Sequence, residues 1–539
     1  MTDLTKKLLP YQVPHLLQLY ECLTIKKRVV DASDTGTGKT YTAIGVAKML
    51  KCRPFIICPK SVISNWIQVC KYFDCEILGI ANYEMLKNCK YYTENYEIVK
   101  CPYMDKEQVV KEKKVDLSES EKTLELIKKM RNEPMKDHYI QMFQKLIEEE
   151  KKNKEEKIKD EYDTNYKFYL PSDTLVILDE AHRCKNFGSL TNKLLMGLNS
   201  NNIRIMMLSA TLSDKLECFK PFGAILGFYK EPKNFPNWIK NKINNYEIIN
   251  KVPLNIKDDT IKLKIIHDSI FPNNGSRMKI KELGDLFPKN NIIANCYYLQ
   301  NHDEVDKAYQ EINNAIKDIK NKELKATILT KILRARQKIE MLKVSLILDL
   351  VEEGLDDNKS IVIFVNFRDT LEYLSKYIKD NLNREDISYI IGDQKISERD
   401  ENIKNFQDNN NKIMICMIQA GNVGISLHDI QGGHPRMSII SPSWSGQDMK
   451  QVFGRIHRAG SKSPAIQKIV YVAGTYEEKI CDILKEKLRN IDGINDGDFS
   501  DPNIEKNDIE EVEKFDNLIN INDIPDNKEQ KKKIKVKAK

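Results

Sequence analysis

The chain has 539 residues, a length that accommodates about three domains of ordinary size. Its 86 Lys and Arg residues against 79 Asp and Glu residues give a formal net charge of +7, a mild basic excess that permits nucleic-acid binding but does not require it. Twelve cysteines without a Cys-x-x-Cys pair argue against a zinc site or a disulfide framework, and the lack of a long apolar run predicts a soluble, intracellular protein without a membrane partner.

The first predicted element is a helix over residues 9–27, which contains Gln12 near its start. In isolation this glutamine is a surface residue. A glutamine just before a nucleotide-binding loop can offer its amide to adenine, which presents a donor beside an acceptor. We therefore predict that Gln12 contacts adenine if such a loop follows.

A phosphate-binding loop follows in the segment 28–40, which reads Arg-Val-Val-Asp-Ala-Ser-Asp-Thr-Gly-Thr-Gly-Lys-Thr. The segment predicts a short buried strand, a glycine-rich turn and the start of a helix. Glycines let backbone N–H groups surround an anion, Lys39 can reach the β- and γ-phosphates, and the Thr40 hydroxyl can bind Mg²⁺. The residues predicted to bind ATP in this loop are Thr35, Gly36, Thr37, Gly38, Lys39 and Thr40.

The elements after this loop predict a parallel α/β sheet. A buried strand at 55–59, a helix from Ser61 and a strand-like piece at 77–80 alternate as in successive strand and helix units. From about 90 to 170 the alternation stops and runs of mixed charge, such as 148–152, dominate. We interpret this stretch as a charged, solvated helical insertion rather than a partner-binding or nucleic-acid arm.

The α/β pattern resumes with the apolar strand 174–178, which ends in Asp179 and Glu180. Acidic residues at the carboxyl end of a strand stand where open α/β sheets bind ligands. We predict that Asp179 holds the Mg²⁺ of the nucleotide and that Glu180 polarises the attacking water. The next apolar strand, 203–208, is followed by Ser209, Ala210 and Thr211, and the two hydroxyls are expected at the same edge of the sheet.

Residues from about 227 to 341 are irregular at first and strongly helical from 302 onward. The basic residues in this part, Arg334 and Arg336 among them, are interpreted as a solvated helix face rather than a phosphate track.

A second α/β unit begins at the apolar strand 360–365, with further strands expected at 387–391, 412–417, 437–440 and 469–472. The segment 451–458 within it carries Arg455 and Arg458, which are one helical turn apart and share a face. Two guanidinium groups on one face suit a cluster of phosphates.

In their number and order, these motifs resemble helicase superfamily 2, and within it the Swi/Snf-like double-stranded DNA translocases. The segments that carry the resemblance are Leu9-Pro10-Tyr11-Gln12, Cys58-Pro59-Lys60-Ser61-Val62-Ile63-Ser64-Asn65-Trp66, Asp179-Glu180-Ala181-His182 through Asn186, and Gln451 through Arg458. The segment Arg336-Gln337-Lys338-Ile339-Glu340-Met341-Leu342-Lys343 resembles annealing-helicase and viral members. The match covers nearly the whole chain apart from the insertion and the tail.

The resemblance implies two RecA-like lobes with ATP and Mg²⁺ in the cleft between them. It agrees with the roles given above to Gln12, Lys39, Thr40, Asp179 and Glu180, and it makes residues 179–182 a DEAH box. Arg455 and Arg458 then correspond to arginine fingers, and Gln451 to a further nucleotide contact. The residues implied to couple ATP to nucleic acid are His182, Ser209, Thr211 and Gly424.

We expect an ATP-binding lobe at 1–228 with the insertion at about 90–170, a helical linker or brace at 229–341, and a second lobe at 342–491. The tail, 492–539, is expected to be disordered, first acidic and then Lys-rich. The resemblance places such a protein in the nucleus or, if viral, at a cytoplasmic replication site or in the virion.

Three positions depart from the Swi/Snf-like pattern. Ser33 replaces the first glycine of the loop, Ser426 stands where the family favours Asn, and Ala459-Gly460-Ser461 follows the arginines in place of Gly-Gln. Three hypotheses remain open: a motor on duplex DNA, which the motifs favour, an RNA helicase, and a transcription or packaging factor that ATP only switches. The sequence indicates no particular protein partner.

Overall fold

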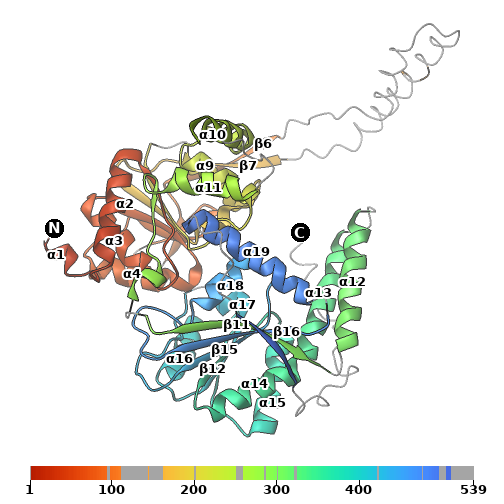
Figure 1. The fold of residues 1–539 in the computed structure, drawn as a ribbon. Helices are drawn as coiled ribbons and strands as arrows, with labels where there is room; N and C mark the ends of the chain where they lie inside the picture. The colour runs from red at the N-terminus through yellow and green to blue at the C-terminus, as the bar shows by residue number, and fades with distance from the viewer. Residues whose placement is uncertain are drawn as a thin grey trace.

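Two lobes, each built on one sheet with helices packed on it, make up the molecule (Figure 1). The computed structural model describes residues 2–93, 97–110, 162–199, 202–250, 259–284, 287–299, 302–320, 325–421, 424–475, 477–496 and 505–511, with Met142 and Gln144 as isolated residues. The predicted fold class, α/β with two RecA-like lobes, is confirmed by these sheets. Among the described helices, none is both long and apolar enough to span a bilayer.

Lobe 1 contains an eight-stranded sheet. In order across the sheet, its strands are β10 (Gly275–Ser276), β1 (Arg28–Asp31), β9 (Arg204–Leu208), β8 (Thr174–Asp179), β2 (Arg53–Cys58), β3 (Gly79–Asn82), β4 (Lys90–Tyr92) and β5 (Ile98–Lys100). Neighbours from β10 to β3 pair in parallel, whereas β4 and β5 are antiparallel at one edge. The phosphate loop and Asp179 therefore follow strands that point the same way, with only β9 between them.

Helices cover both faces of this sheet. Successive residues of a strand point to opposite faces, so each strand contributes to two apolar cores. Val29 of β1 packs into one apolar core and Val30 into the other. The helices on the first face are α2 (Gln12–Lys26), α3 (Lys39–Met49) and α4 (Ile63–Tyr72). Those on the second are α8 (Leu190–Asn199), α9 (Lys220–Ile225), α10 (Phe235–Asn250) and α11 (Asp259–Ile270).

Short elements complete lobe 1. They are α1 (Thr2–Thr5), α5 (Tyr83–Leu86) and the 3-10 turns η1 (Lys60–Val62), η2 (Ala181–Cys184), η3 (Leu216–Phe219), η4 (Pro232–Asn234) and η5 (Ile280–Glu282).

Lobe 2 contains a seven-stranded sheet in which every described pair is parallel. In order, its strands are β13 (Ile387–Ile390), β14 (Ile413–Met417), β12 (Ser360–Val365), β15 (Arg436–Ile440), β16 (Ala465–Val472), β11 (Asn290–Tyr298) and β17 (Glu505–Glu511). Its helices are α12 (His302–Lys320), α13 (Lys325–Leu342), α14 (Val344–Asp356), α15 (Arg368–Leu382), α16 (Ile396–Gln407), α17 (Ile418–Gly421), α18 (Gly446–Phe453) and α19 (Glu477–Asp496).

The structure distributes residues 229–341 differently from the helical linker that the sequence predicts. The first part supplies α10, α11 and β10 to lobe 1, and the second supplies β11, α12 and α13 to lobe 2. The cause is pairing with strands distant in sequence, since β10 pairs with β1 and β11 with β16. The remaining domain boundaries stay a prediction.

The described ends of the 90–170 stretch are strands, so the expectation of helix is wrong there. β6 (Met104–Val110) and β7 (Tyr162–Phe168) pair as an antiparallel ribbon, and β4 and β5 extend the main sheet. The charged runs between β6 and β7 lie outside the described residues, apart from Met142 and Gln144.

The expectation of disorder from residue 492 onward is also wrong in part. Helix α19 continues to Asp496, and β17 adds a strand to the edge of the lobe 2 sheet. The Lys-rich end lies outside the described residues. Helix α19 begins in lobe 2 and reaches lobe 1, where Ile494 is buried in the apolar core with α11 (Figure 1).

Candidate active site

The phosphate loop joins β1 to α3, and two of its glycines have backbone angles that other residues rarely adopt. Gly36 has a φ of +92° and Gly38 a φ of +90°. A Cβ atom on Gly36 would lie 2.8 Å from Cγ of Arg458, and one on Gly38 would lie 2.2 Å from Nε2 of Gln12. Glycine is therefore required at both positions, for the turn and for the close approach of two side chains.

The loop offers a positive, donor-rich surface that fits a triphosphate. Lys39 Nζ donates to the carbonyl oxygens of Ser33 at 2.8 Å and of Asp34 at 3.1 Å. Burial lowers the pKa of Lys39, and the nearby carboxylates of the site act in the opposite direction. Within the described residues, the backbone N–H groups of Gly36 and of residues 38–40 donate to no acceptor. Phosphate oxygens would satisfy these amides.

Gln12 is buried against the loop rather than exposed. Its Nε2 donates to the Thr37 carbonyl oxygen at 2.9 Å, and its Oε1 accepts from the backbone N–H of Leu9 at 3.0 Å. The Tyr11 hydroxyl donates to the same Thr37 oxygen at 3.2 Å. Both ends of the Gln12 amide thus support the loop, and the adenine contact stays a prediction.

Asp179, at the end of β8, is held by two hydrogen bonds. Its Oδ2 accepts from the indole N–H of Trp66 at 2.9 Å and its Oδ1 from the backbone N–H of Glu180 at 3.0 Å. Burial and the charge of Glu180 raise the pKa of Asp179 to about 7. Two adjacent, half-buried carboxylates fit a divalent cation. Thr40 and Asp179 would hold Mg²⁺, which would neutralise charge on the phosphates.

Glu180 has a φ of +52° and a ψ of +49°, a left-handed conformation that costs a non-glycine residue about 1–3 kcal/mol. This turn directs the carboxylate toward the other lobe. Its Oε2 accepts from Nε2 of Gln451 at 3.1 Å and lies 3.4 Å from Nδ1 of His182. Gln451 thus touches the predicted catalytic carboxylate, and its predicted contact with the nucleotide stays a prediction.

His182 connects the acidic pair to the end of β9. Its Nδ1 lies 3.1 Å from the Ser209 hydroxyl, which also accepts from the backbone N–H of Thr211 at 3.2 Å. Burial lowers the pKa of His182 to about 4, so the ring is neutral at pH 7. The carbonyl oxygen of Thr211 accepts from Nε2 of Gln447 at 2.7 Å. These predicted coupling residues form one path from β8 and β9 to α18 of lobe 2.

The two predicted arginine fingers lie in lobe 2, where Arg455 is buried and Arg458 is half-buried against the phosphate loop. Arg455 donates to the carbonyl oxygens of Gln451 at 3.0 Å and of Ile425 at 3.1 Å. Arg458 donates to the Gly454 carbonyl oxygen at 2.9 Å and packs against Gly36. Burial lowers the pKa of Arg455 to about 10, and burial together with the charge of Arg455 lowers the pKa of Arg458. Two guanidinium groups, one of which lowers the pKa of the other, fit an anion between them.

Two further contacts close the lobes on each other. A Cβ atom on Gly454 would lie 2.8 Å from Cβ of Thr35 in the loop. Gly424, with a φ of +74°, packs onto η1, since a Cβ atom there would lie 2.4 Å from Cγ1 of Val62. Gly424, predicted as a coupling residue, is therefore an interlobe contact.

Three serines at positions that depart from the family pattern make hydrogen bonds in this site. Ser33 Oγ lies 3.2 Å from Nε2 of His15 and accepts from the backbone N–H of Met278 at 2.9 Å. Ser426 Oγ accepts from Nη1 of Arg458 at 2.7 Å, and Ser461 Oγ accepts from the backbone N–H of Arg458 at 3.1 Å. Ser33 thus joins the phosphate loop to its neighbours, and Ser426 and Ser461 are hydrogen-bond partners of Arg458.

Gln447 is not among the predicted site residues, although the sequence contains a signal for it. It precedes Gln451 by four residues on α18, so the two amides share a helix face. Both project across the lobe boundary, one to Thr211 and one to Glu180.

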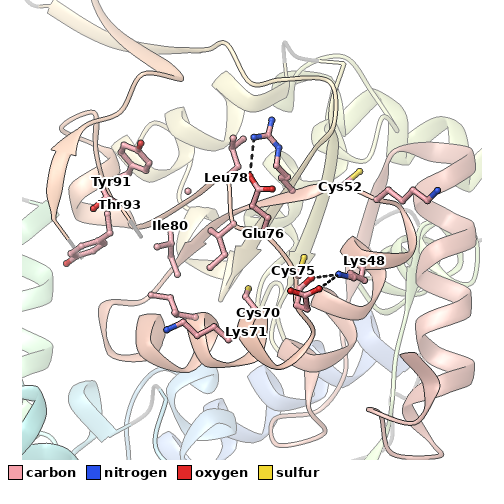
Figure 2. Close-up of a pocket in the computed structure, with 17 residues that line it drawn as sticks. Lys48, Cys52, Cys70, Lys71, Cys75, Glu76, Leu78, Ile80, Tyr91 and Thr93 are labelled. Atoms are coloured by element: carbon pink, nitrogen blue, oxygen red, sulfur yellow. Dashed lines mark hydrogen bonds and ion pairs between the residues drawn. The ribbon is translucent and has the colours of Figure 1, made fainter. Parts of the chain in front are cut away.

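A cavity of about 1,020 Å³ in lobe 1 contains none of the predicted site residues (Figure 2). It lies beside α4 and β3 and is lined in part by Cys52, Cys70 and Cys75. Burial raises the pKa of these thiols. In the part of the chain that the structure describes, no group of three or more His, Cys, Asp or Glu residues is suited to hold a metal ion.

Comparisons with known proteins agree with this geometry. Residues 338–460 match the helicase conserved C-terminal domain, and residues 5–214 match the type III restriction enzyme res subunit. A protein of Acanthamoeba polyphaga mimivirus, named as an ATP-dependent RNA helicase, is 33% identical over 511 residues, which cover 92% of this chain and 85% of that protein.

Two similarities at lower identity are also found. A RAD54-like DNA repair and recombination protein of Drosophila grimshawi is 24% identical over 57% of this chain and 44% of its own length. The SWI2/SNF2 ATPase core of Sulfolobus solfataricus in complex with dsDNA is 18% identical over 91% of this chain and 93% of that chain, with a TM-score of 0.32. The extended identity to the viral protein and the two matched helicase regions establish the family. The chain belongs to helicase superfamily 2, as a Swi/Snf-like ATP-hydrolysing helicase or translocase.

Proposed function

We propose that this ATP-dependent nucleic-acid motor acts on duplex DNA, which it tracks with little strand separation. In the proposed site, Gln12 contacts adenine, the loop residues from Thr35 to Thr40 hold the phosphates, and Asp179 and Thr40 hold Mg²⁺. Glu180 positions the attacking water. Arg455 and Arg458 neutralise charge that develops on the phosphates in the transition state.

The observation that carries the proposal is a basic groove that crosses both lobes, here called the interlobe groove. It joins two hollows of about 700 and 400 Å³ that share Gln419. Its basic residues in lobe 1 are Lys60, Lys90, Arg183, Lys185 and Lys215, and those in lobe 2 are Arg336, Arg399 and Lys487. Its acidic residues, fewer in number, are Glu84, Asp214 and Asp448.

The groove begins where the ATP site ends. Lys60 and Ser61 belong to η1, and Arg183 and Lys185 directly follow the acidic pair and His182. Lysines and arginines along such a groove contact phosphates rather than base edges. Those that are exposed are Lys60, Lys90, Arg183 and Lys215. A motor that holds a polynucleotide this way binds with little sequence preference and loses affinity steeply with salt.

RNA is the second candidate, because the viral relative that matches most of the chain is named as an RNA helicase. Phosphate contacts alone do not distinguish the two polymers. Duplex DNA is favoured by the segments at 58–66 and 179–186, which resemble the Swi/Snf-like branch.

The test compares ATPase stimulation by duplex DNA, single-stranded DNA and RNA, together with displacement of a third strand from a DNA triplex and unwinding of forked DNA and RNA duplexes. We expect strongest stimulation by duplex DNA and triplex displacement with little unwinding. Strong RNA stimulation with efficient unwinding and no triplex displacement would select the RNA helicase instead. An ATPase that no polynucleotide stimulates would favour the ATP-switched factor.

Matched variants test the groove itself. Arg183→Ala should raise the DNA concentration for half-maximal stimulation and reduce the salt slope by about one. Lys376→Ala, an exposed lysine on α15, serves as the control. Equal effects of the two variants would show that general charge, not the groove, binds the polymer.

A further inference from the structure

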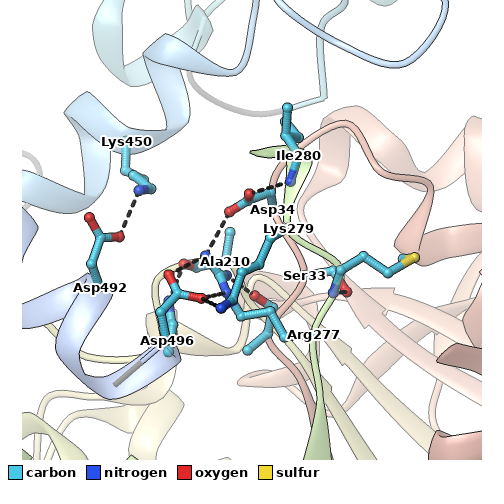
Figure 3. A network of polar contacts seen from close by, with 12 residues as sticks. Ser33, Asp34, Ala210, Arg277, Lys279, Ile280, Lys450, Asp492 and Asp496 are labelled. Atoms are coloured by element: carbon cyan, nitrogen blue, oxygen red, sulfur yellow. Dashed lines mark hydrogen bonds and ion pairs between the residues drawn. The ribbon is translucent and has the colours of Figure 1, made fainter. Parts of the chain in front are cut away.

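Arg277 lies outside the motifs identified in the sequence, yet it stands beside the phosphate loop (Figure 3). It follows β10, at the start of the connection to lobe 2, and its side chain is 6% exposed. The guanidinium donates to Oδ1 of Asp34 at 2.9 Å, to Oδ2 of Asp496 at 2.9 Å and to the carbonyl oxygen of Ala32. One buried cation thus joins the loop to the last residue of α19.

Asp34 transmits this contact to Lys39. Its Oδ2 accepts from the backbone N–H of Ile280 at 2.9 Å, and its own backbone N–H donates to the carbonyl oxygen of Met278 at 3.0 Å. On the other side, its carbonyl oxygen accepts from Nζ of Lys39 at 3.1 Å and from the hydroxyl of Thr37 at 2.9 Å. A displacement of the Asp34 side chain therefore moves the oxygen on which the Lys39 ammonium rests.

Asp496 belongs to a helix that spans both lobes. Helix α19 starts in lobe 2 at Glu477, and its last turn enters lobe 1, where Asn495 Nδ2 donates to the carbonyl oxygen of Ala210 at 2.7 Å. Lys279 lies 3.4 Å from Asp496 and adds a second cation. The position of Asp496 therefore depends on how lobe 2 is seated on lobe 1.

We propose that Arg277 is a positioning residue for ATP hydrolysis, which fixes Asp34, and through it Lys39, according to the position of the last turn of α19. The inference rests on the phosphate loop being the ATP site, as proposed above. A buried guanidinium shared by two carboxylates cannot lose either partner cheaply, because an uncompensated buried charge is strongly unfavourable. The contact therefore holds the phosphate loop and α19 in one relative position, and movement of lobe 2 reaches the loop by a route that does not include Arg458.

The test uses two Asp→Asn variants one helical turn apart on α19. Asp496→Asn removes the carboxylate that Arg277 contacts. Asp492→Asn is the matched control, because the Asp492 carboxylate pairs at 2.8 Å with Lys450 of lobe 2, whereas that of Asp496 pairs with Arg277. We expect Asp496→Asn to lower kcat for ATP about tenfold with KM changed less than about twofold, and Asp492→Asn to leave both within about twofold. Because the Arg277 pair is more buried than the Lys450 pair, Asp496→Asn should also melt at a lower temperature than Asp492→Asn, and the rates are compared at a temperature at which both variants are folded.

A double variant of Asp496 and Arg277 tests whether the two residues act on kcat through the same contact. In an Arg277→Met background, or in Arg277→Lys if the methionine variant does not fold, Asp496→Asn should reduce kcat by less than about twofold more, because the two changes break one path. Equal losses of kcat in Asp496→Asn and Asp492→Asn, or additive losses in the double variant, would overturn the proposal. Lys39→Ala is measured in parallel, since a Lys39→Ala protein that retained ATPase activity would reject the ATP-site assignment instead.

Discussion

Trp66 provides a direct test of the proposed Mg²⁺ site, because its only polar atom touches a proposed Mg²⁺ ligand. The side chain is fully buried, and its indole N–H donates to Oδ2 of Asp179 at 2.9 Å. Phenylalanine at this position keeps an aromatic ring and removes the donor. We predict that Trp66→Phe raises the Mg²⁺ concentration for half-maximal ATPase activity about tenfold while kcat at saturating Mg²⁺ stays within about threefold.

The size of this effect follows from the hydrogen bonds of Asp179. A hydrogen bond to a charged group contributes about 1.5–3 kcal/mol, and loss of a group that orients a metal ligand costs about 10- to 100-fold in metal affinity. We expect the lower end of that range, because the backbone N–H of Glu180 still holds Oδ1 at 3.0 Å.

Tyr83→Phe is the matched control. The Tyr83 hydroxyl donates at 2.7 Å to the backbone carbonyl oxygen of Asp179 and not to its carboxylate. Both variants remove one hydrogen bond from the same residue and keep a ring, so both should lower the melting temperature. The assay is the steady-state ATPase rate against free Mg²⁺ at saturating ATP. The same Mg²⁺ dependence in Trp66→Phe, Tyr83→Phe and the parent chain would refute this account of Asp179.

The remaining predictions concern hydrolysis and pH. Glu180→Gln should bind ATP and lower turnover by about 10²- to 10⁴-fold, whereas Lys39→Ala should lose both, as measured by nucleotide binding and single-turnover hydrolysis. Arg458→Ala should lower kcat by about 10³- to 10⁵-fold with a much smaller change in ATP affinity, and a matching loss of affinity without further loss of rate would indicate ground-state binding. Burial lowers the pKa of His182 to about 4; Arg183 and Lys185 also lower it, and Glu180 raises it. In the unfolded chain the same ring takes up a proton below about pH 6.5. Because only the unfolded state binds this proton, the free energy of unfolding should fall by about 2 kcal/mol between pH 7 and pH 5. Denaturant unfolding at the two pH values should show this decrease in the parent chain and not in His182→Asn.

The strands that carry the site were predictable because they are buried on both faces. Such strands have no polar face, so β8 and β12 read as continuous apolar runs and their ends mark where ligand-binding residues stand. This is why the phosphate loop and Asp179 could be placed at one edge of a parallel sheet. The chemical roles given to these residues stay predictions.

Elements formed by distant pairing were not predictable. β10 consists of Gly275 and Ser276, two residues without strand propensity, and it exists because β1 offers an unpaired edge beside the phosphate loop. The amphipathic pattern of α19 was readable, but nothing in it indicates that its last turn packs into the other lobe. Arg277 gave no signal for the same reason, since its partners lie 243 and 219 residues away.

In the proposed site, hydrolysis depends on how the lobes are seated. Gln447 links the two sides of the boundary, because its Nε2 donates to the Thr211 carbonyl oxygen near the ATP site and its Oε1 accepts from Lys185 of the interlobe groove. Four residues further along the chain, Gln451 holds Glu180. A rotation of lobe 2 that changes the width of the groove therefore shifts the partner of the catalytic carboxylate and also the contact between Arg458 and Gly36. Because packed interfaces switch between discrete arrangements, a polynucleotide that fits only one width of the groove also selects one arrangement of the catalytic residues.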